Sequence, residues 1–179
     1  MHRPNALVFV RRNGLIVTGK HVSPARFNFD EQTVKNLEVL DAPELIKQCE
    51  QFFGAQSLGH RKVLMVLDQD ITFEKILPAG KPPSKEALDA FIAAMPFEMG
   101  KRAGFSVAVD DTTRLYGANA ELFTALRTAL LTVDAKVIAI TPLALYGLEP
   151  GQQLKNVVSK LLHDKSVRKQ ADFVHGAPV

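Results

Sequence analysis

The sequence contains little cysteine and no long apolar run. Its 179 residues include one cysteine, Cys49, so no internal disulfide can form and a reducing compartment is the simpler expectation. Near the start, the apolar run 6–10 ends at arginine and is too short for the core of a signal peptide. No stretch approaches the roughly twenty apolar residues that span a bilayer. We therefore expect a soluble protein of the cytoplasm.

Charge of one sign is not in strong excess. The formal net charge is +3, which is too weak to indicate nucleic-acid binding without basic residues concentrated on one face. The basic residues that stand out lie near the two ends: Arg3, Arg11, Arg12, Lys155, Lys160, Lys165, Arg168 and Lys169. We interpret them as solvated surface. A nucleic-acid-binding module that uses these ends is the alternative.

Motifs that carry chemistry are also missing. There is no G-x-S-x-G for an esterase and neither of the glycine-rich phosphate loops. The five histidines are scattered and form no pattern of metal ligands. The sequence therefore predicts no catalytic residue, no cofactor and no metal site.

Strand patterns recur along the chain. The runs 6–10 and 15–22 flank an Asn-Gly pair and predict a hairpin with a tight turn at 11–14. Further strands are expected at 63–67, 71–77, 105–109, 113–117 and 136–140. The acidic pairs Asp68/Asp70 and Asp110/Asp111 fall between strands. We interpret both as turns rather than as metal ligands or catalytic carboxylates.

Helix patterns separate the strands. Asp41, Ser84 and Asn119 are expected to cap three helices, and a short helix is expected near 31–37. Cys49 lies on the apolar stripe of the helix that follows Asp41, which indicates a small buried hydrophobe. A last amphipathic helix follows Pro150. Its apolar stripe consists of Leu154, Val157, Val158, Leu161 and Leu162.

The order of these elements resembles a known family. The block 62–148 contains KVLMVLDQDITFEKILP, a helix closing in Pro96, Phe97 and Glu98, then YGANAELFTAL and VIAITPLALYGL. It is similar to the actin-like PilM proteins of type IV pilus assembly and to the cytoplasmic domain of GspL in type II secretion. The segment RFNFDEQTVKNLEVLDAPELIKQCEQFF also resembles the N-terminal region of pilus-assembly members.

Two features depart from the actin-like ATPases. Those enzymes carry an acidic residue and a glycine after the first buried strand residues, in a loop against the nucleotide phosphates. This chain has VFVRRNGL there. Its 179 residues are also too few for the complete two-lobed ATPase. No nucleotide-binding residue is carried over from the resemblance.

The resemblance implies an α/β fold with mixed sheets: a reduced actin-like, ribonuclease H-like fold of two small lobes. We expect one lobe from 1–60 with 119–163, the other from 61–118, and a basic flexible tail at 164–179.

The function implied is a non-enzymatic cytoplasmic scaffold of a type IV pilus or type II secretion assembly platform. It would lie at the inner membrane through its partners or through a removed anchor. The partners implied are inner-membrane platform proteins and, through them, an assembly ATPase. A partner segment could lie against a sheet edge or between the lobes. Leu154, Val157 and Leu161 are candidate partner-binding residues, for a platform protein or a homodimer, unless their stripe completes the core. The enzyme alternative is an actin-like ATPase that binds ATP and magnesium.

Overall fold

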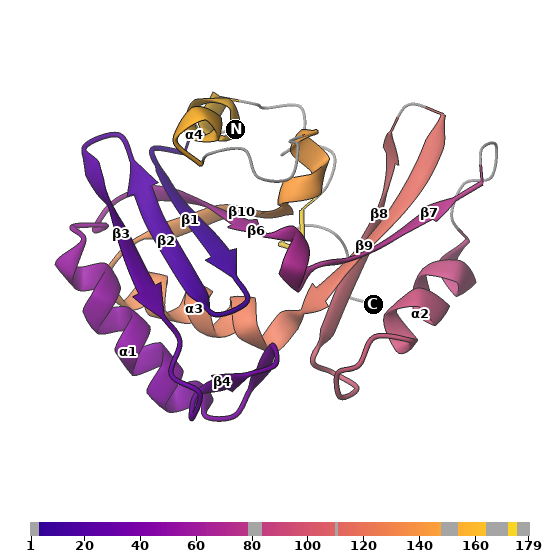
Figure 1. Ribbon diagram of the computed structural model, residues 1–179, viewed down its shortest axis with the longest axis horizontal. Coiled ribbons are helices and arrows are strands. Elements are labelled where there is room, and N and C mark those ends of the chain that lie inside the picture. The colour runs from indigo at the N-terminus through magenta and orange to yellow at the C-terminus, as the bar shows by residue number, and fades with distance from the viewer. Residues whose placement is uncertain (1–3, 79–83, 110, 148–153, 164–171, 175–179) are drawn as a thin grey trace.

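The computed structural model describes residues 4–78, 84–109, 111–147, 154–163 and 172–174. Two lobes are visible in Figure 1. The large lobe is built on a five-stranded sheet, and the small lobe is a three-stranded antiparallel sheet with one helix. The α/β class with mixed sheets that the sequence predicts is confirmed.

The five-stranded sheet combines parallel and antiparallel pairs. Its strands, in sheet order, are β10 (Lys136–Pro142), β6 (Lys62–Leu67), β1 (Ala6–Arg11), β2 (Gly14–Gly19) and β3 (Val22–Asn28). β1 and β10 run parallel to β6, whereas β2 is antiparallel to both β1 and β3. The predicted hairpin is confirmed, because β1 and β2 are joined by a tight turn at Arg12 and Asn13. The second strand ends earlier than expected, and β3 was not predicted.

The central strands are continuously apolar because both faces of the sheet are covered. The side chains of Ala6, Val8 and Val10 on β1 pack under the helices α1 (Ala42–Ala55) and α3 (Ala120–Thr132). The alternate residues Leu7 and Phe9 pack on the other face, toward α4 (Leu154–His163) and the 3-10 turn η2 (Leu143–Tyr146). Because successive side chains of a strand point to opposite faces, β1 contributes to the hydrophobic clusters on both faces of the sheet.

The predicted caps of α1 and α3 are confirmed. Asp41 Oδ1 accepts a hydrogen bond of 3.0 Å from the Glu44 N–H, and Asn119 Oδ1 accepts one of 2.8 Å from the Glu121 N–H. Each satisfies a backbone donor that the first helical turn leaves unpaired. Cys49 is fully buried on α1, as its stripe predicts.

The helix expected near 31–37 is wrong. This segment contains two short antiparallel strands, β4 (Val34–Lys35) and β5 (Glu38–Val39), joined by a turn in which Asn36 and Leu37 have φ values of 52° and 70°. Asp30 Oδ1 accepts a hydrogen bond from the Gln32 N–H, a local turn that competes with helix initiation.

The small lobe contains β7 (Phe73–Leu77), α2 (Lys85–Ala93), β8 (Arg102–Val109) and β9 (Thr112–Asn119), with the strand order β7-β9-β8. Gly104 on β8 and Gly117 on β9 are paired across the sheet. Because they have no side chains, the sheet can lie close to α2 and the residues that follow it. A Cβ atom at Gly104 would lie 2.8 Å from a side-chain carbon of Ile92, and one at Gly117 would lie 2.5 Å from Met95 Sδ. The turns predicted at the two acidic pairs agree with the order of the elements along the chain. Asp68 begins the 3-10 turn η1 (Gln69–Ile71), and Asp111 lies between β8 and β9.

Two predicted boundaries need correction. Segment 61–118 was assigned to the second lobe, yet β6 lies between β1 and β10 in the large sheet, so the small lobe begins only after η1. The expected flexible tail 164–179 is also wrong at 172–174. Asp172 and Phe173 are buried there, and the Phe173 ring packs on Phe105 and Phe123. The rest of that tail lies outside the described residues.

Candidate functional site

The carboxyl ends of the parallel strands meet at one edge of the large sheet, where α/β proteins commonly place their sites. The β1–β2 turn contributes Arg11 and Arg12 to this edge, and the chain leaving β6 contributes Asp68 and Asp70. Arg11 Nε lies 3.2 Å from Asp68 Oδ2, and the Arg12 N–H donates to Asp70 Oδ2 at 3.4 Å. Parallel pairing of β1 with β6 brings these groups together although they are far apart in the sequence.

Asp68 mainly organises the turn that it begins. Its Oδ1 accepts a hydrogen bond of 2.7 Å from the Gln69 N–H, and its own N–H donates to the Val10 carbonyl at 2.9 Å. Partial burial raises the pKa of the Asp68 carboxyl, while the Gln69 N–H and Arg11 oppose that shift. Among the described residues, no group of three His, Cys, Asp or Glu side chains could hold a metal ion.

A hollow of about 210 Å³ opens beside this turn. Its walls come from β2, β3, the β1–β2 turn and η1, and its lining includes Arg12, Ile16, Arg26, Phe27, Asn28 and Asp70. Sequence reasoning singled out Arg12 only as surface charge and Asp70 only as a turn residue, and it missed Arg26 and Phe27. The alternation of RFNF at 26–29 was the available signal for a strand there.

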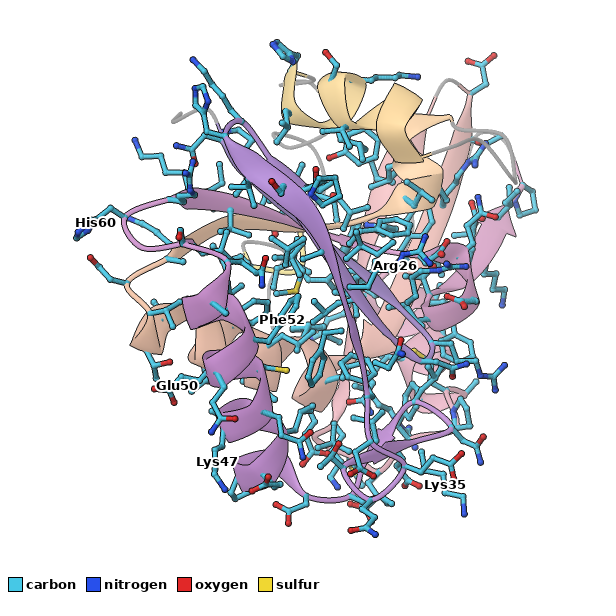
Figure 2. The ribbon with its side chains drawn as sticks, turned by 60° about the vertical axis from the view of Figure 1, so that its left-hand side comes forward. Arg26, Lys35, Lys47, Glu50, Phe52 and His60 are labelled. Atoms are coloured by element: carbon cyan, nitrogen blue, oxygen red, sulfur yellow. The ribbon has the colours of Figure 1, made fainter. Side chains whose placement is uncertain are left out.

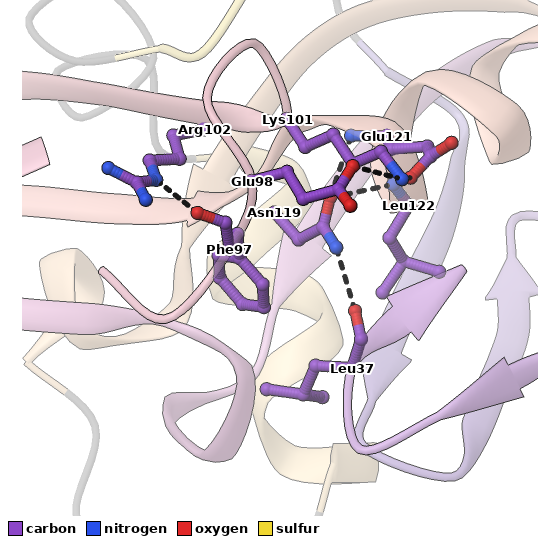
Figure 3. Close-up of polar contacts among 8 residues, drawn as sticks. All are labelled: Leu37, Phe97, Glu98, Lys101, Arg102, Asn119, Glu121 and Leu122. Atoms are coloured by element: carbon purple, nitrogen blue, oxygen red, sulfur yellow. Dashed lines mark hydrogen bonds and ion pairs between the residues drawn. The ribbon is translucent and has the colours of Figure 1, made fainter. Parts of the chain in front are cut away.

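A polar network holds the small lobe against the large one (Figure 3). Lys101 Nζ lies 3.1 Å from Glu98 Oε2 and 3.1 Å from Glu121 Oε2, so it joins the turn before β8 to α3. Asn119 Nδ2 donates to the Leu37 carbonyl at 2.8 Å while its Oδ1 caps α3. The network fixes the loop between β4 and β5 to the start of α3.

Arg102 closes the carboxyl end of α2 within the small lobe. Its guanidinium donates to the carbonyls of Ala93 at 2.7 Å and Phe97 at 2.5 Å. Carbonyls in the last turn of a helix have no partner within the helix, and a cation is favourable there. The Pro96–Phe97–Glu98 segment that carries the family resemblance therefore serves here as a structured helix exit.

A second polar group lies on the face of the small sheet opposite α2. The Tyr116 hydroxyl donates to Glu74 Oε1 at 2.9 Å, and an Arg114 guanidinium nitrogen lies 3.1 Å from the same oxygen. Burial, followed by the hydrogen bond to Glu74, raises the pKa of Tyr116 to about 12. The phenol is thus held in its neutral form and acts as a donor.

The predicted partner-binding residues lie on α4. Leu161 is fully buried and belongs to the cluster that contains Leu7, Phe9 and Tyr146. This burial favours the core interpretation for Leu161, which a partner cannot reach while α4 is docked. The side chains of Leu154 and Val157 lie outside the described residues, so their part in partner binding stays a prediction.

The remaining candidate groups do not converge. Burial raises the pKa of the Cys49 thiol to about 12, which suits a packing role. His60 pairs with Asp134, and both side chains are largely exposed. Within the described residues, no helix is both long and apolar enough to cross a membrane.

No family model matches the sequence, and no curated protein matches it. Among solved structures, the chain is similar to the PilM–PilN type IV pilus biogenesis complex, with a TM-score of 0.53 and 13% identity. That match covers 81% of this chain and 49% of the other, so the chain spans about half of the PilM–PilN chain that it matches.

Two further structures align with lower scores. The cytoplasmic domain of EpsL, an inner-membrane component of the type II secretion system of Vibrio cholerae, gives 0.47 at 10% identity, covering 82% of this chain and 60% of that one. A protein of unknown function with an actin-like ATPase fold from Bacteroides thetaiotaomicron gives 0.42 at 9% identity, covering 78% and 52%.

The match to the PilM–PilN structure shows the fold. The predicted resemblance to PilM-type proteins is confirmed at that level, as an α/β fold with mixed sheets.

Proposed function

We propose that the chain is a non-enzymatic cytoplasmic scaffold of a type IV pilus, or type II secretion, inner-membrane assembly platform. The observation that carries the proposal is the likeness to a chain of the PilM–PilN type IV pilus biogenesis complex, over 81% of this chain. The partners are inner-membrane platform proteins, and through them the scaffold contacts an assembly ATPase. Binding to these partners keeps it at the membrane.

The β1–β2 turn supports a binding role over a catalytic one. In actin-like ATPases this turn faces the nucleotide phosphates with an acidic residue and glycine. Here Arg11 and Arg12 occupy it, and Arg11 is paired with Asp68. The buried phenol of Tyr116 and the buried thiol of Cys49 are both held neutral. Neither is poised for proton transfer near pH 7.

The proposal is tested by affinity purification of the tagged chain, expressed at its natural level, from detergent-solubilised cells. We expect inner-membrane pilus or secretion platform proteins to be enriched at least about tenfold over a tag-only control. Recovery at the level of the control would contradict the proposal.

An actin-like ATPase is the second candidate, because the element order resembles the actin-like family. Mg–ATP binding and phosphate release distinguish the ATPase from the scaffold. An ATPase binds Mg–ATP and releases phosphate in proportion to the concentration of the chain, whereas a scaffold does neither.

A further inference from the structure

The two edges of the five-stranded sheet are not equivalent. At the β10 edge, the Ile140 N–H donates to Asp172 Oδ1 at 2.8 Å and the Phe173 N–H donates to the Ile140 carbonyl at 2.9 Å. The chain itself therefore covers that edge. At the opposite edge, no other described strand pairs with the outer side of β3, which faces the viewer in Figure 2. An uncovered edge presents unpaired backbone groups that can bind another strand.

The register identifies the backbone groups that are free. The Phe29 N–H donates to the Asn13 carbonyl at 3.0 Å, so residue 29 directs its backbone toward β2. Backbone direction alternates along an antiparallel strand, so Arg26 and Asn28 direct their N–H and C=O groups away from β2. The regular part is short, because the pairing shifts near Pro24, which has no N–H. Four backbone groups remain for pairing.

The two faces of this edge differ in chemistry. Arg26 lies opposite Ile16, on the face that carries α4, and lines the hollow together with Arg12. Neither guanidinium takes part in an ion pair among the described residues, and both residues are exposed. Asp70 also lines the hollow, and one of its carboxylate oxygens accepts the Arg12 N–H. This face attracts carboxylates.

The other face of β3 is aromatic. The ring of Phe27 lies 5.2 Å from that of Phe52 on α1 and 6.1 Å from that of Phe29. All three rings are only partly buried. In Figure 2 Phe52 and Arg26 lie on opposite sides of the strand. A new strand at this edge would therefore meet basic groups on one face and aromatic rings on the other.

We propose that the outer edge of β3 binds an extended segment of a partner protein in which acidic and apolar residues alternate. The segment adds a sixth strand and pairs with the backbone of Arg26 and Asn28. Its acidic side chains point to Arg12 and Arg26, and its apolar side chains pack on Phe27 and Phe52. The inference rests on the proposed binding function and names the chemistry of one of its partners.

Peptides supply the test. The probe is the synthetic peptide Val-Glu-Val-Glu-Val-Glu-Val, compared with a version methylated at every glutamate nitrogen and a version methylated at every internal valine nitrogen. Only one set of N–H groups can face β3, so one version should bind at least about tenfold more weakly and the other should bind like the parent. If the peptide pairs antiparallel to β3, methylation of its glutamate nitrogens should weaken binding. If it pairs parallel to β3, methylation of its valine nitrogens should weaken binding. Equal binding of all three peptides would overturn the proposal.

A charge-reversal pair provides the second arm. Arg26→Glu should weaken the parent peptide at least about tenfold, whereas the matched Lys35→Glu, on the exposed turn strand β4, should change it less than about twofold. Hydrogen exchange adds a local readout: the bound peptide should slow exchange at the amides of Arg26 and Asn28. Equal weakening by both variants, or no new protection at these amides, would show a diffuse basic surface and overturn the edge assignment.

The inference and the proposed function can fail separately. If platform proteins bind the Arg26→Glu variant as well as the natural chain, the scaffold role stands and the β3 edge is not its surface. If no platform protein binds the natural chain, the scaffold role fails, and the peptide experiment still decides whether the edge accepts a strand.

Discussion

The ring of Phe173 lies 4.8 Å from the ring of Phe105, edge to face, and this contact joins the chain beyond α4 to the small lobe. Phe173 also lies 5.4 Å from Phe123 on α3. A single side chain therefore contacts both lobes from a segment whose neighbours in sequence are mostly polar. It acts as an anchor at the junction of the two lobes.

Replacing this anchor should destabilise the protein. Phe173→Ala is expected to lower the free energy of unfolding by about 3 kcal/mol, because it removes a buried ring and two aromatic contacts. Urea denaturation followed by circular dichroism measures the change. Phe29→Ala, at a partly buried ring, is the control and should cost clearly less. Equal costs would show that Phe173 does not anchor the lobes.

The Asn119 side chain has two functions that mutation can separate. Asn119→Ala loses both the cap of α3 and the donor to Leu37, and is expected to cost about 2–4 kcal/mol of unfolding free energy. Asn119→Ser keeps a capping oxygen but cannot reach Leu37, so it should cost an intermediate amount. Ser84→Ala removes only the exposed cap of α2 and should cost about 1 kcal/mol. If Asn119→Ala and Ser84→Ala cost the same, the contact with Leu37 contributes nothing.

Alkaline pH should weaken the fold through Tyr116. Its folded pKa of about 12 lies above the ordinary value of 10.0 for a tyrosine, so its contribution is complete below pH 10 and is lost as the pH rises toward 12. The natural chain should therefore lose more unfolding free energy between pH 9.5 and 11.5 than Tyr116→Phe does, by about 1–2 kcal/mol. Because the chain has no tryptophan and two tyrosines, the tyrosinate absorbance that Tyr116→Phe removes reports the titration of Tyr116. Parallel pH profiles for the two proteins would contradict the buried-phenol account.

Leu161 separates core packing from partner binding on α4. Leu161→Ala should cost about 2–5 kcal/mol of unfolding free energy, because the side chain fills the space above Leu7 and Phe9. Ser159→Ala, at an exposed position of the same helix, should change stability by less than about 0.5 kcal/mol. A stable Leu161→Ala protein with altered sedimentation would instead support an interface role.

The regular part of the fold could be predicted from the sequence. Asp41 and Asn119 are followed by helical spacing, and Asn13–Gly14 separates two apolar runs, so local signals were enough for these elements. β3 carries Pro24 and polar residues because its edge faces outward, and it lacks the apolar run of a central strand. Phe173 is a single aromatic residue in a polar stretch, and local sequence patterns therefore predict a flexible tail there.

The candidate site was harder to predict than the fold. Arg11 meets Asp68 only because β1 and β6 pair in parallel, and Lys101 meets Glu121 only because the small lobe folds back on α3. Such contacts join residues that are distant in the sequence and leave no local pattern. The family resemblance pointed to the fold, but its motifs could not place these pairs.

The central claim is that the chain works by binding platform proteins and not by turning over a nucleotide. The most direct measurement is isothermal titration calorimetry of the purified chain with the cytoplasmic segment of a PilN-type protein from the same organism, and separately with Mg–ATP. We predict saturable heat with a dissociation constant of about 10 µM or tighter for the segment, and no saturable heat for Mg–ATP. Saturable heat for Mg–ATP with none for the segment would contradict the account.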